Sequence, residues 1–327
     1  MSVLLVLALS LALTPAVALA KSAPAWPADM GSQAYGYVRQ LAAIQRVAGT
    51  EGEVRAGDLT ESAFRKAGYE VSIQPFTFAL WDDPDQVAYP SRNIVALKKA
   101  TTGAAAPGRR SLVIVGAHYD KVKIGTGADD NASGAGVLVE VAERVARMKT
   151  GYDLRFVAFG AEEAGLFGAD HFVKRMAAED VARCVAMVNY DSLLVGDKLY
   201  AHAGMRADGS PADTSVREAI LRAAERTGQP IVIQQGLNPA YPAGCTPDGF
   251  SDYTSFNQAG IPICAFEATN WEIGEYDGWI QTESHGSFWH TGRDRLSTIE
   301  ALFPGRPMAH LKAYTTVTCE FLREFGD

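Results

Sequence analysis

The amino-acid sequence predicts a single α/β domain with a mixed, mostly parallel central sheet flanked by helices. Apolar runs with β-type and helical spacing alternate along the chain, as expected for a sheet covered by helices. Two β-type runs, residues 112–117 and 154–160, enclose a helical pattern at 132–148, the arrangement of a βαβ unit with parallel strands. Beyond residue 30 no repeat or linker-like tract interrupts the 327-residue chain, so we expect one domain over residues 32–327.

Residues 1–20 have the composition of a secretory signal peptide. They contain no charged side chain, and the apolar run Val3–Leu13 leads to a small-residue exit at Ala18–Ala20. The segment is shorter than a membrane span. The alternative is that it forms a buried part of the core. We therefore expect cleavage after Ala20, a linker at 21–31, and an exported chain, periplasmic or extracellular, without stable membrane association.

The remaining elements follow from periodicity. Helical spacing predicts helices at 32–47 and 59–67, separated by a glycine-containing break at 49–52, and β-type runs predict a hairpin from 70–78 and 92–98. After the βαβ unit we expect helices at 164–178, 213–227, 251–258 and 306–324 and strands at 185–190, 199–203, 231–235 and 261–268. Loops 236–249 and 269–289 flank the last strand, and their length predicts that they wall a functional site.

Charge and cysteine content exclude some classes of protein. The net charge is −8 and no basic cluster occurs, which argues against nucleic acid or an anionic membrane as a partner. Four cysteines are too few for a disulfide scaffold in a chain of this length. Cys245, in a loop rich in glycine and proline, is the better candidate for a bridge, while the pairing with Cys184, Cys264 or Cys319 stays open.

Acidic and imidazole side chains follow three of the predicted strands. His118 and Asp120 come after the first strand of the βαβ unit, Glu162 and Glu163 after the second, and Asp191 after the run 185–190. The carboxyl ends of parallel strands meet at one edge of a sheet. Carboxylates gathered there repel one another unless a cation is present. The sequence therefore predicts a metal site at this edge.

The residue types suggest a division of labour. A metal-bound imidazole usually needs a carboxylate nearby, which Asp120 can supply for His118. Adjacent Glu162 and Glu163 point in different directions, so one can bind metal while the other acts as general base; the alternative is a solvated surface pair. Asp130, at a loop-to-helix junction, can be a ligand or simply cap the following helix.

A late histidine is needed to complete the set. His290 is the best candidate, and His285, on the same loop, competes with it. We expect His171 and His202, in a predicted helix and strand, to be structural. One histidine alone carries little weight, so the metal hypothesis rests on the whole group.

Five motifs in order carry a family resemblance. They are GAHYD (116–120), GADDNASG (127–134), GAEEAGLFG (160–168), NYDS (189–192) and WHT (289–291). From about residue 40 to the end, the chain resembles the M28 family of zinc aminopeptidases. The stretches DSLLVGDKLY, GLNPAYPAGC, FEATNW and LFPGR are most similar to the alkaline phosphatase isozyme-conversion group of that family.

The resemblance implies the zinc-dependent exopeptidase fold, two Zn²⁺ per chain and hydrolysis of N-terminal residues from peptides or proteins. It also implies a cis peptide between Asp130 and Asn131. The implied roles are as follows: His118 and Glu163 bind different zinc ions, Asp130 bridges both, Asp191 and His290 complete the sites, Glu162 is the general base, and Asp120 orients His118.

The substrate pocket departs from the family pattern. Tyr253 and Trp289 stand where the family often has histidine and tyrosine, so we expect them to line the pocket. Glu267, together with Glu272, Glu275 and Asp277, could meet a basic side chain, or these residues could form a solvated acidic loop. The isozyme-conversion group removes N-terminal arginine, which favours a preference for Arg or Lys.

Two other functions fit part of the pattern. One is a glutaminyl cyclase with a single zinc on the same fold, which needs only three protein ligands. The other is a catalytically silent peptide-binding protein, although the sequence lacks none of the expected ligands.

Overall fold

The computed structural model describes residues 25–81, 83–103 and 110–325. Its centre is an eight-stranded sheet in the order β1-β2-β4-β3-β5-β8-β6-β7. The strands are β1 (Glu70–Phe78), β2 (Tyr89–Lys98), β3 (Leu112–His118), β4 (Asp153–Phe159), β5 (Cys184–Tyr190), β6 (Lys198–His202), β7 (Ile231–Val232) and β8 (Ile263–Thr269). The predicted signal peptide and most of the predicted linker lie outside the described residues.

The four central strands are parallel, and the outer ones make the sheet mixed. β4, β3, β5 and β8 pair in parallel, whereas β2 runs antiparallel to β4 and β6 runs antiparallel to β8. The carboxyl ends of the four parallel strands therefore lie at one edge, where the sequence places its acidic residues. The predicted fold class, one α/β domain with a mostly parallel sheet, is confirmed.

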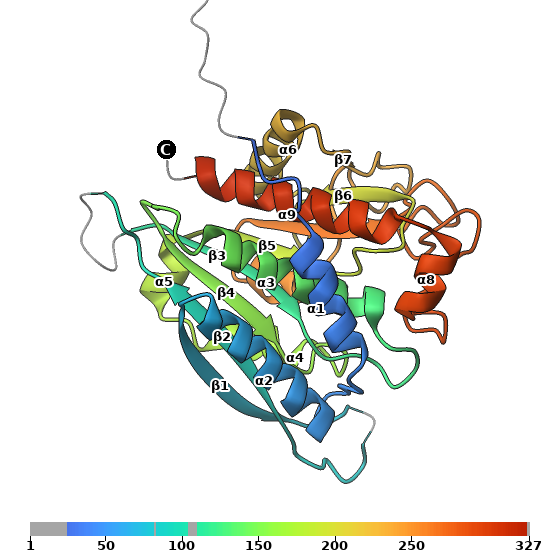
Figure 1. The fold of residues 1–327 in the computed structure, drawn as a ribbon, viewed down its shortest axis with the longest axis horizontal. Coiled ribbons are helices and arrows are strands. Elements are labelled where there is room, and N and C mark those ends of the chain that lie inside the picture. Colours follow the sequence, from blue (N-terminus) through green and yellow to red (C-terminus); the bar gives the residue numbers. More distant parts are fainter. Residues whose placement is uncertain (1–24, 82, 104–109, 326–327) are drawn as a thin grey trace, which may run out of the picture.

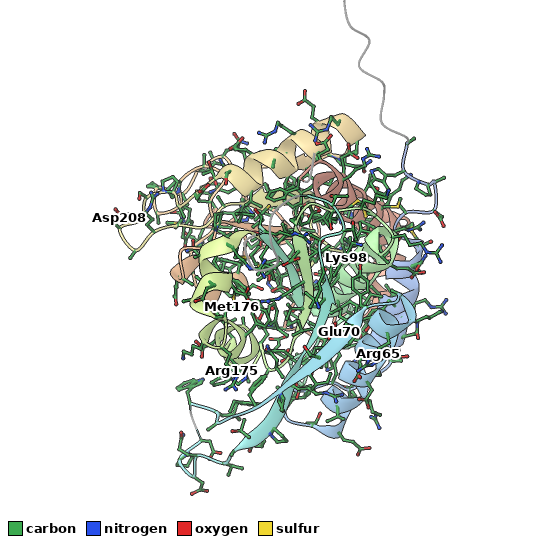
Figure 2. The ribbon with its side chains drawn as sticks, turned by 90° about the vertical axis from the view of Figure 1, so that its left-hand side faces the viewer. Arg65, Glu70, Lys98, Arg175, Met176 and Asp208 are labelled. Carbon is green, nitrogen blue, oxygen red and sulfur yellow. The ribbon has the colours of Figure 1, made fainter. Side chains whose placement is uncertain are left out.

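Helices cover both faces of the sheet. They are α1 (Ser32–Ala42), α2 (Glu51–Lys66), α3 (Gly134–Val145), α4 (Phe167–Lys174), α5 (Ala178–Arg183), α6 (Ser215–Thr227), α7 (Tyr253–Gln258), α8 (Leu296–Leu302) and α9 (Arg306–Glu324). In Figure 1, α1, α2, α3 and α9 lie in front of the sheet. Figure 2 views the layers from the side, with Arg65 of α2 on one side of the strands and Arg175 and Met176, just after α4, on the other.

Strand periodicity divides the core between these two faces. In β3, Val113 and Val115 pack with the larger helical layer of α1, α2, α3, α6 and α9. Their neighbours Leu112 and Ile114 pack with α4 and α7 on the opposite face. All seven residues of β3 are buried, as expected for a central parallel strand. The strand ends that carry the site are thus fixed from both sides.

The predicted helix boundaries were wrong near the N-terminus. The first helix ends at Ala42 instead of 47, because the chain then turns inward and buries Arg46, whose guanidinium donates to the Thr126 and Gly127 carbonyls. The second helix begins at Glu51 instead of 59. The segment taken as a break contains its N-cap, since the Thr50 side chain accepts a hydrogen bond from the Glu53 amide.

Other differences concern short elements. A π-helical turn, Ala128–Ser133, precedes α3, and the single helix expected at 164–178 is two helices, α4 and α5. The strand expected at 231–235 has only two residues, and α8 was not predicted. The four cysteines are all buried and free, so the bridge considered for Cys245 does not form here. Among the described residues, no helix is both long and apolar enough to cross a membrane.

Candidate metal centre

A cavity of about 370 Å³ opens at the carboxyl edge of the sheet. Its wall contains acidic side chains from the ends of β4 and β5 and from the turn before α3. Both long loops contribute as predicted, with Thr246 and Gly249 from one and Asp277, Gly278 and Trp279 from the other. The group of residues predicted from strand ends therefore faces one enclosed space.

The first group of possible metal ligands joins the ends of β3 and β5. His118, the last residue of β3, has its Nε2 atom 3.4 Å from the Asp130 Oδ1 atom and 3.5 Å from the Asp191 Oδ1 atom. One donor atom from each residue lies within 4.8 Å of the other two. A cation placed among them would be held by one imidazole and two carboxylates.

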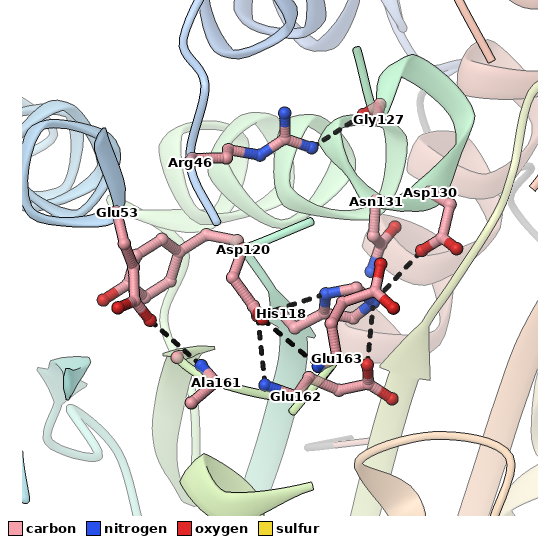
Figure 3. Close-up of polar contacts among 12 residues, drawn as sticks. Arg46, Glu53, His118, Asp120, Gly127, Asp130, Asn131, Ala161, Glu162 and Glu163 are labelled. Carbon is pink, nitrogen blue, oxygen red and sulfur yellow. Dashed lines mark hydrogen bonds and ion pairs between the residues drawn. The ribbon is translucent and has the colours of Figure 1, made fainter. Parts of the chain in front are cut away.

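The second group contains Asp130 again. The His290 Nε2 atom is 3.2 Å from the Asp130 Oδ2 atom and 3.0 Å from the Glu163 Oε2 atom. Asp130 thus points its Oδ1 toward His118 and its Oδ2 toward His290, as a carboxylate between two ions would. His285 belongs to neither group of ligands and packs instead against the Phe303 ring. Figure 3 shows His118, Asp130 and Glu163 converging on one point.

Glu162 lies beside both groups without belonging to either. Its Oε2 atom is 3.7 Å from the His118 Nε2 atom, and the side chain lines the cavity. The adjacent glutamates therefore do point in different directions, which supports the separate roles expected for them.

Asp120 holds the turn that carries the two glutamates. Its Oδ1 accepts the Glu162 amide at 3.1 Å, and its Oδ2 accepts the Glu163 amide at 3.2 Å. The distance from Oδ1 to the His118 Nδ1 atom is longer, 3.5 Å. Asp120 consequently links the end of β3 to the end of β4, in addition to facing the imidazole as predicted (Figure 3).

A second buried carboxylate, missed in the sequence, supports the same turn. Glu53 of α2 accepts the Ala161 amide at 3.0 Å, the Ser91 hydroxyl at 2.6 Å and the Gly49 amide at 2.7 Å. Ala161 has φ = 54°, an unfavourable conformation for a residue with a Cβ atom. Glu53 therefore helps to hold the bend that turns Glu162 toward the cavity.

The loop before Asp130 is gripped at both its amides and its carbonyls. The carboxylate of Asp294 accepts the Asp129 amide at 2.7 Å and the Asp130 amide at 3.1 Å. Arg46, fully buried, donates to the Gly127 carbonyl at 2.7 Å (Figure 3). Gly127 has φ = 61°, and a Cβ atom there would lie 2.6 Å from the Asp130 carbonyl oxygen. The Asp130–Asn131 peptide is cis, as the family resemblance implies.

Electrostatics make the site demanding without a cation. Burial raises the pKa of Glu162, and the neighbouring Glu163 and Asp191 raise it further against the opposing effect of His118. Burial and Asp130 raise the pKa of Glu163 to about 7. Contacts with Asp130 and Glu163 raise the pKa of His290 to about 10. In the metal-free chain protons must therefore neutralise these groups, which a divalent cation would do in their place.

The donor set fits zinc. Imidazole nitrogen and carboxylate oxygen are both zinc ligands. Neither ring nitrogen of the buried His118 makes a hydrogen bond among the described residues, which leaves the Nε2 atom free to bind a metal. Asp191, by contrast, is steadied through its Oδ2, which accepts the Ser251 hydroxyl at 2.7 Å. Ser251 in turn accepts the Asn189 side-chain amide at 2.9 Å.

Comparison with known proteins decides the family. The model of Peptidase family M28 matches residues 93–310, which include every motif residue of the cavity. The chain belongs to peptidase family M28. It is therefore an enzyme of a peptidase family, as the motifs indicated.

Individual M28 relatives support this assignment. The chain is 32% identical over 288 residues to the alkaline phosphatase isozyme conversion protein of Escherichia coli K12, covering 80% of each chain. Its fold is similar to that of a zinc aminopeptidase from Bacillus subtilis, with a TM-score of 0.68 at 20% identity over 90% of this chain and 95% of the other. It is equally similar to glutaminyl cyclase from Fimbriiglobus ruber, with a TM-score of 0.69 at 20% identity over 92% and 96% of the two chains. The fold alone thus does not distinguish these two activities.

The pocket of this M28 enzyme contains the three residues expected there, Tyr253, Glu267 and Trp289. Of the other acidic residues considered, Asp277 also lines the cavity, whereas Glu272 pairs with Lys198 away from it. Part of the acidic loop therefore faces the pocket and part faces solvent.

Sequence reasoning missed His202, which was expected to be structural. It lines the cavity, and its Nε2 atom is 2.8 Å from the Glu267 Oε1 atom. It also missed Asp252, whose two buried carboxylate oxygens make no hydrogen bond among the described residues. The strand-end rule could not find either residue, because neither directly follows one of the parallel strands.

Proposed function

We propose that this M28 enzyme is an aminopeptidase that holds two zinc ions and removes N-terminal residues from peptides or proteins. The observation that carries the proposal is the position of Asp130, which faces both groups of ligands through different oxygens. His118 and Asp191 would hold one zinc ion with Asp130, and Glu163 and His290 the other.

When bound, the zinc ions would lower the pKa of a water molecule and polarise the scissile carbonyl. The protein supplies the proton transfers. Glu162 faces the cavity, and its raised pKa suits a group that takes a proton and returns it. Its carboxylate would accept the proton from the attacking water and pass it to the nitrogen of the leaving amine.

The cavity also suits a free N-terminus. A protonated α-amino group would be attracted by the carboxylates at the carboxyl edge of the sheet, among them Glu162 and Asp191. Peptides with a blocked N-terminus would lose this attraction. The acidic wall thus provides a reason for cleavage at chain ends.

We further propose a preference for basic N-terminal residues. Glu267 and Asp277 add negative charge to the pocket, and Phe250 and Trp279 offer aromatic surface for the stem and head of an arginine or lysine. His202 shares the Glu267 carboxylate, which weakens but does not remove this charge. Comparing Arg, Lys and Leu p-nitroanilides would test the preference, and equal kcat/KM values for all three would contradict it.

The central test combines a metal count with activity. Elemental analysis should find two zinc ions per chain, and the loaded enzyme should release amino acids from unblocked peptides. A single zinc at full occupancy, with cyclisation of N-terminal glutamine, would favour a glutaminyl cyclase instead. Two ions without any amino acid release across a broad peptide panel would favour a peptide-binding protein.

Export is part of the proposal and rests on the uncharged apolar segment at residues 1–20. Cleavage after Ala20 would leave Lys21 as the first residue. N-terminal sequencing of protein isolated from the periplasm or medium of the expressing bacterium should find this residue. Full-length protein confined to the cytoplasm would contradict export.

A further inference from the structure

One buried glutamine lies between the loops that carry the metal ligands. Gln281 is 0% exposed, and its side chain makes three hydrogen bonds. Its Nε2 donates to the Asp129 Oδ2 atom at 2.5 Å, while its Oε1 accepts the Phe288 amide at 2.7 Å and the Trp289 amide at 3.2 Å. The residue thus connects the neighbour of Asp130 to the neighbour of His290.

Asp129 continues the connection to the third ligand loop. Its Oδ1 accepts the Leu194 amide at 2.6 Å, three residues after Asp191. Its carbonyl accepts the Ser133 hydroxyl at 2.5 Å, and that hydroxyl accepts the Leu193 amide at 2.8 Å. Asp129 therefore fixes the loop of Asp130 against the segment after β5.

We propose that Gln281 and Asp129 form a positioning pair that sets the distance of His290 from Asp130 and Asp191. The proposal rests on the proposed role of these three residues as metal ligands. It adds to that role the means by which loops far apart in the sequence are held in register.

His290 needs such a support more than the other ligands. His118 closes a central strand, and Glu163 and Asp191 lie just beyond the ends of two others, so the sheet itself positions them. His290 lies in a loop, its side chain is 53% exposed, and its φ of 53° is unusual for a residue with a Cβ atom. The two amides that precede it, bonded to Gln281, are its nearest fixed points.

The chemistry of the contacts determines how the glutamine must face. Asp129 offers only acceptors on the contacted side if it is ionised, and the Phe288 and Trp289 amides offer only donors. A carboxamide satisfies both because it has a donor end and an acceptor end. A glutamate at position 281 would place two carboxylates against each other, although it has the same shape.

This polarity gives a rescue experiment. Gln281→Glu should weaken the zinc ion on the His290 side, because the Asp129 contact becomes repulsive and the loop shifts. Adding Asp129→Asn should restore the contact with reversed polarity: the asparagine would donate through its Nδ2 to the carboxylate introduced at position 281 and still accept the Leu194 amide through its Oδ1. The net charge of the double variant equals that of the wild type.

The readout is metal release, measured with a chromogenic chelator, and the absorption of the cobalt-substituted protein. Partners of this kind typically change metal affinity by about 10- to 100-fold. We expect Gln281→Glu to lose one of two ions about 10- to 100-fold more readily, and the double variant to return to within about 3-fold of the wild type. If Gln281→Glu does not fold, Gln281→Met, which removes the polar contacts without adding charge, should show the same selective loss.

Gln234 provides a matched control. It is also buried and also makes several side-chain hydrogen bonds, here to the Pro242 and Cys245 carbonyls and from the Gly236 amide. Gln234→Glu should lower stability while both ions stay tightly bound. Selective loss of an ion in this control would overturn the positioning role of Gln281.

The outcomes separate this inference from the proposed function. Fewer than two zinc ions in the wild type would refute the proposed two-zinc site and with it the ligand positions assumed here. Two ions in the wild type, released at the same rate from Gln281→Glu or Gln281→Met, would overturn the inference alone. Failure of Asp129→Asn to rescue Gln281→Glu would likewise overturn it, because a general packing role predicts additive damage.

Discussion

Glu162 and Glu163 are adjacent glutamates with contrasting predicted roles, so exchanging each for glutamine separates proton transfer from metal binding. Glu162→Gln should keep both zinc ions, because the side chain lies outside both groups of ligands. The Glu162 amide bond to Asp120 is unaffected by the substitution. The turn should therefore keep its shape while the group that accepts the proton is lost.

The size of the effect follows from the proposed chemistry. A positioned general base contributes about 10²- to 10⁴-fold to a rate, which corresponds to about 3–5 kcal/mol of transition-state stabilisation. We expect kcat of Glu162→Gln to fall by this factor with little change in KM. The metal-free variant should be no less stable than the wild type, because glutamine removes one of several carboxylates that repel one another.

Glu163→Gln is the control, since its Oε2 atom lies 3.0 Å from the His290 Nε2 atom within a group of ligands. It should lose one zinc ion. The assay is hydrolysis of an aminoacyl p-nitroanilide at saturating zinc, with elemental analysis of the same samples. The base assignment fails if Glu162→Gln loses metal while its activity is restored by excess zinc, or if its kcat equals that of the wild type.

Three further predictions follow from the same contacts. Asp130→Ala should deplete both zinc positions, because the carboxylate faces both groups; elemental analysis showing two tightly held ions would contradict bridging. Zinc binding at pH 7 should release protons and tighten as the pH rises, because the pKa of His290 is raised to about 10 in the metal-free chain; calorimetry in buffers of different ionisation enthalpy would show no release if this is wrong. Stability should fall on acidification through His310, whose pKa is lowered to about 4 by burial and by Arg306. Since the unfolded chain takes up this proton near pH 6.5 and the folded chain only near 4, the wild type should lose about 2 kcal/mol more than His310→Gln between pH 7 and 5. Urea unfolding at the two pH values measures this difference, and parallel losses in both proteins would refute it.

The strand-end residues could be predicted because their signal is local. Apolar runs ending in His118, Glu162 and Asp191 need only the rule that parallel strands present their carboxyl ends at one edge. The same locality explains why β1 and α9 were predicted with the observed bounds. It also explains the error at α2, where glycines next to the capping Thr50 look like a break in a helix.

The supporting residues could not be predicted, because their partners are distant in the sequence. Gln281 bonds to Asp129 across 152 positions, and Asp294 bonds to Asp130 across 164. Glu53 reaches Ala161 from a different helix. Nothing in the neighbouring sequence of these three residues distinguishes a buried carboxylate or amide from an exposed one.

By itself, then, the sequence determined the fold class, the family and the residues gathered at the carboxyl edge, because strand periodicity and the order of the motifs are properties of neighbouring residues. Only the tertiary structure decided which oxygen of Asp130 faces which histidine, that Asp120 holds the glutamate turn, and that His202 lies on the pocket wall. These facts depend on distances between separate loops. Such distances are set by packing on the sheet and by buried hydrogen bonds, which no local pattern records.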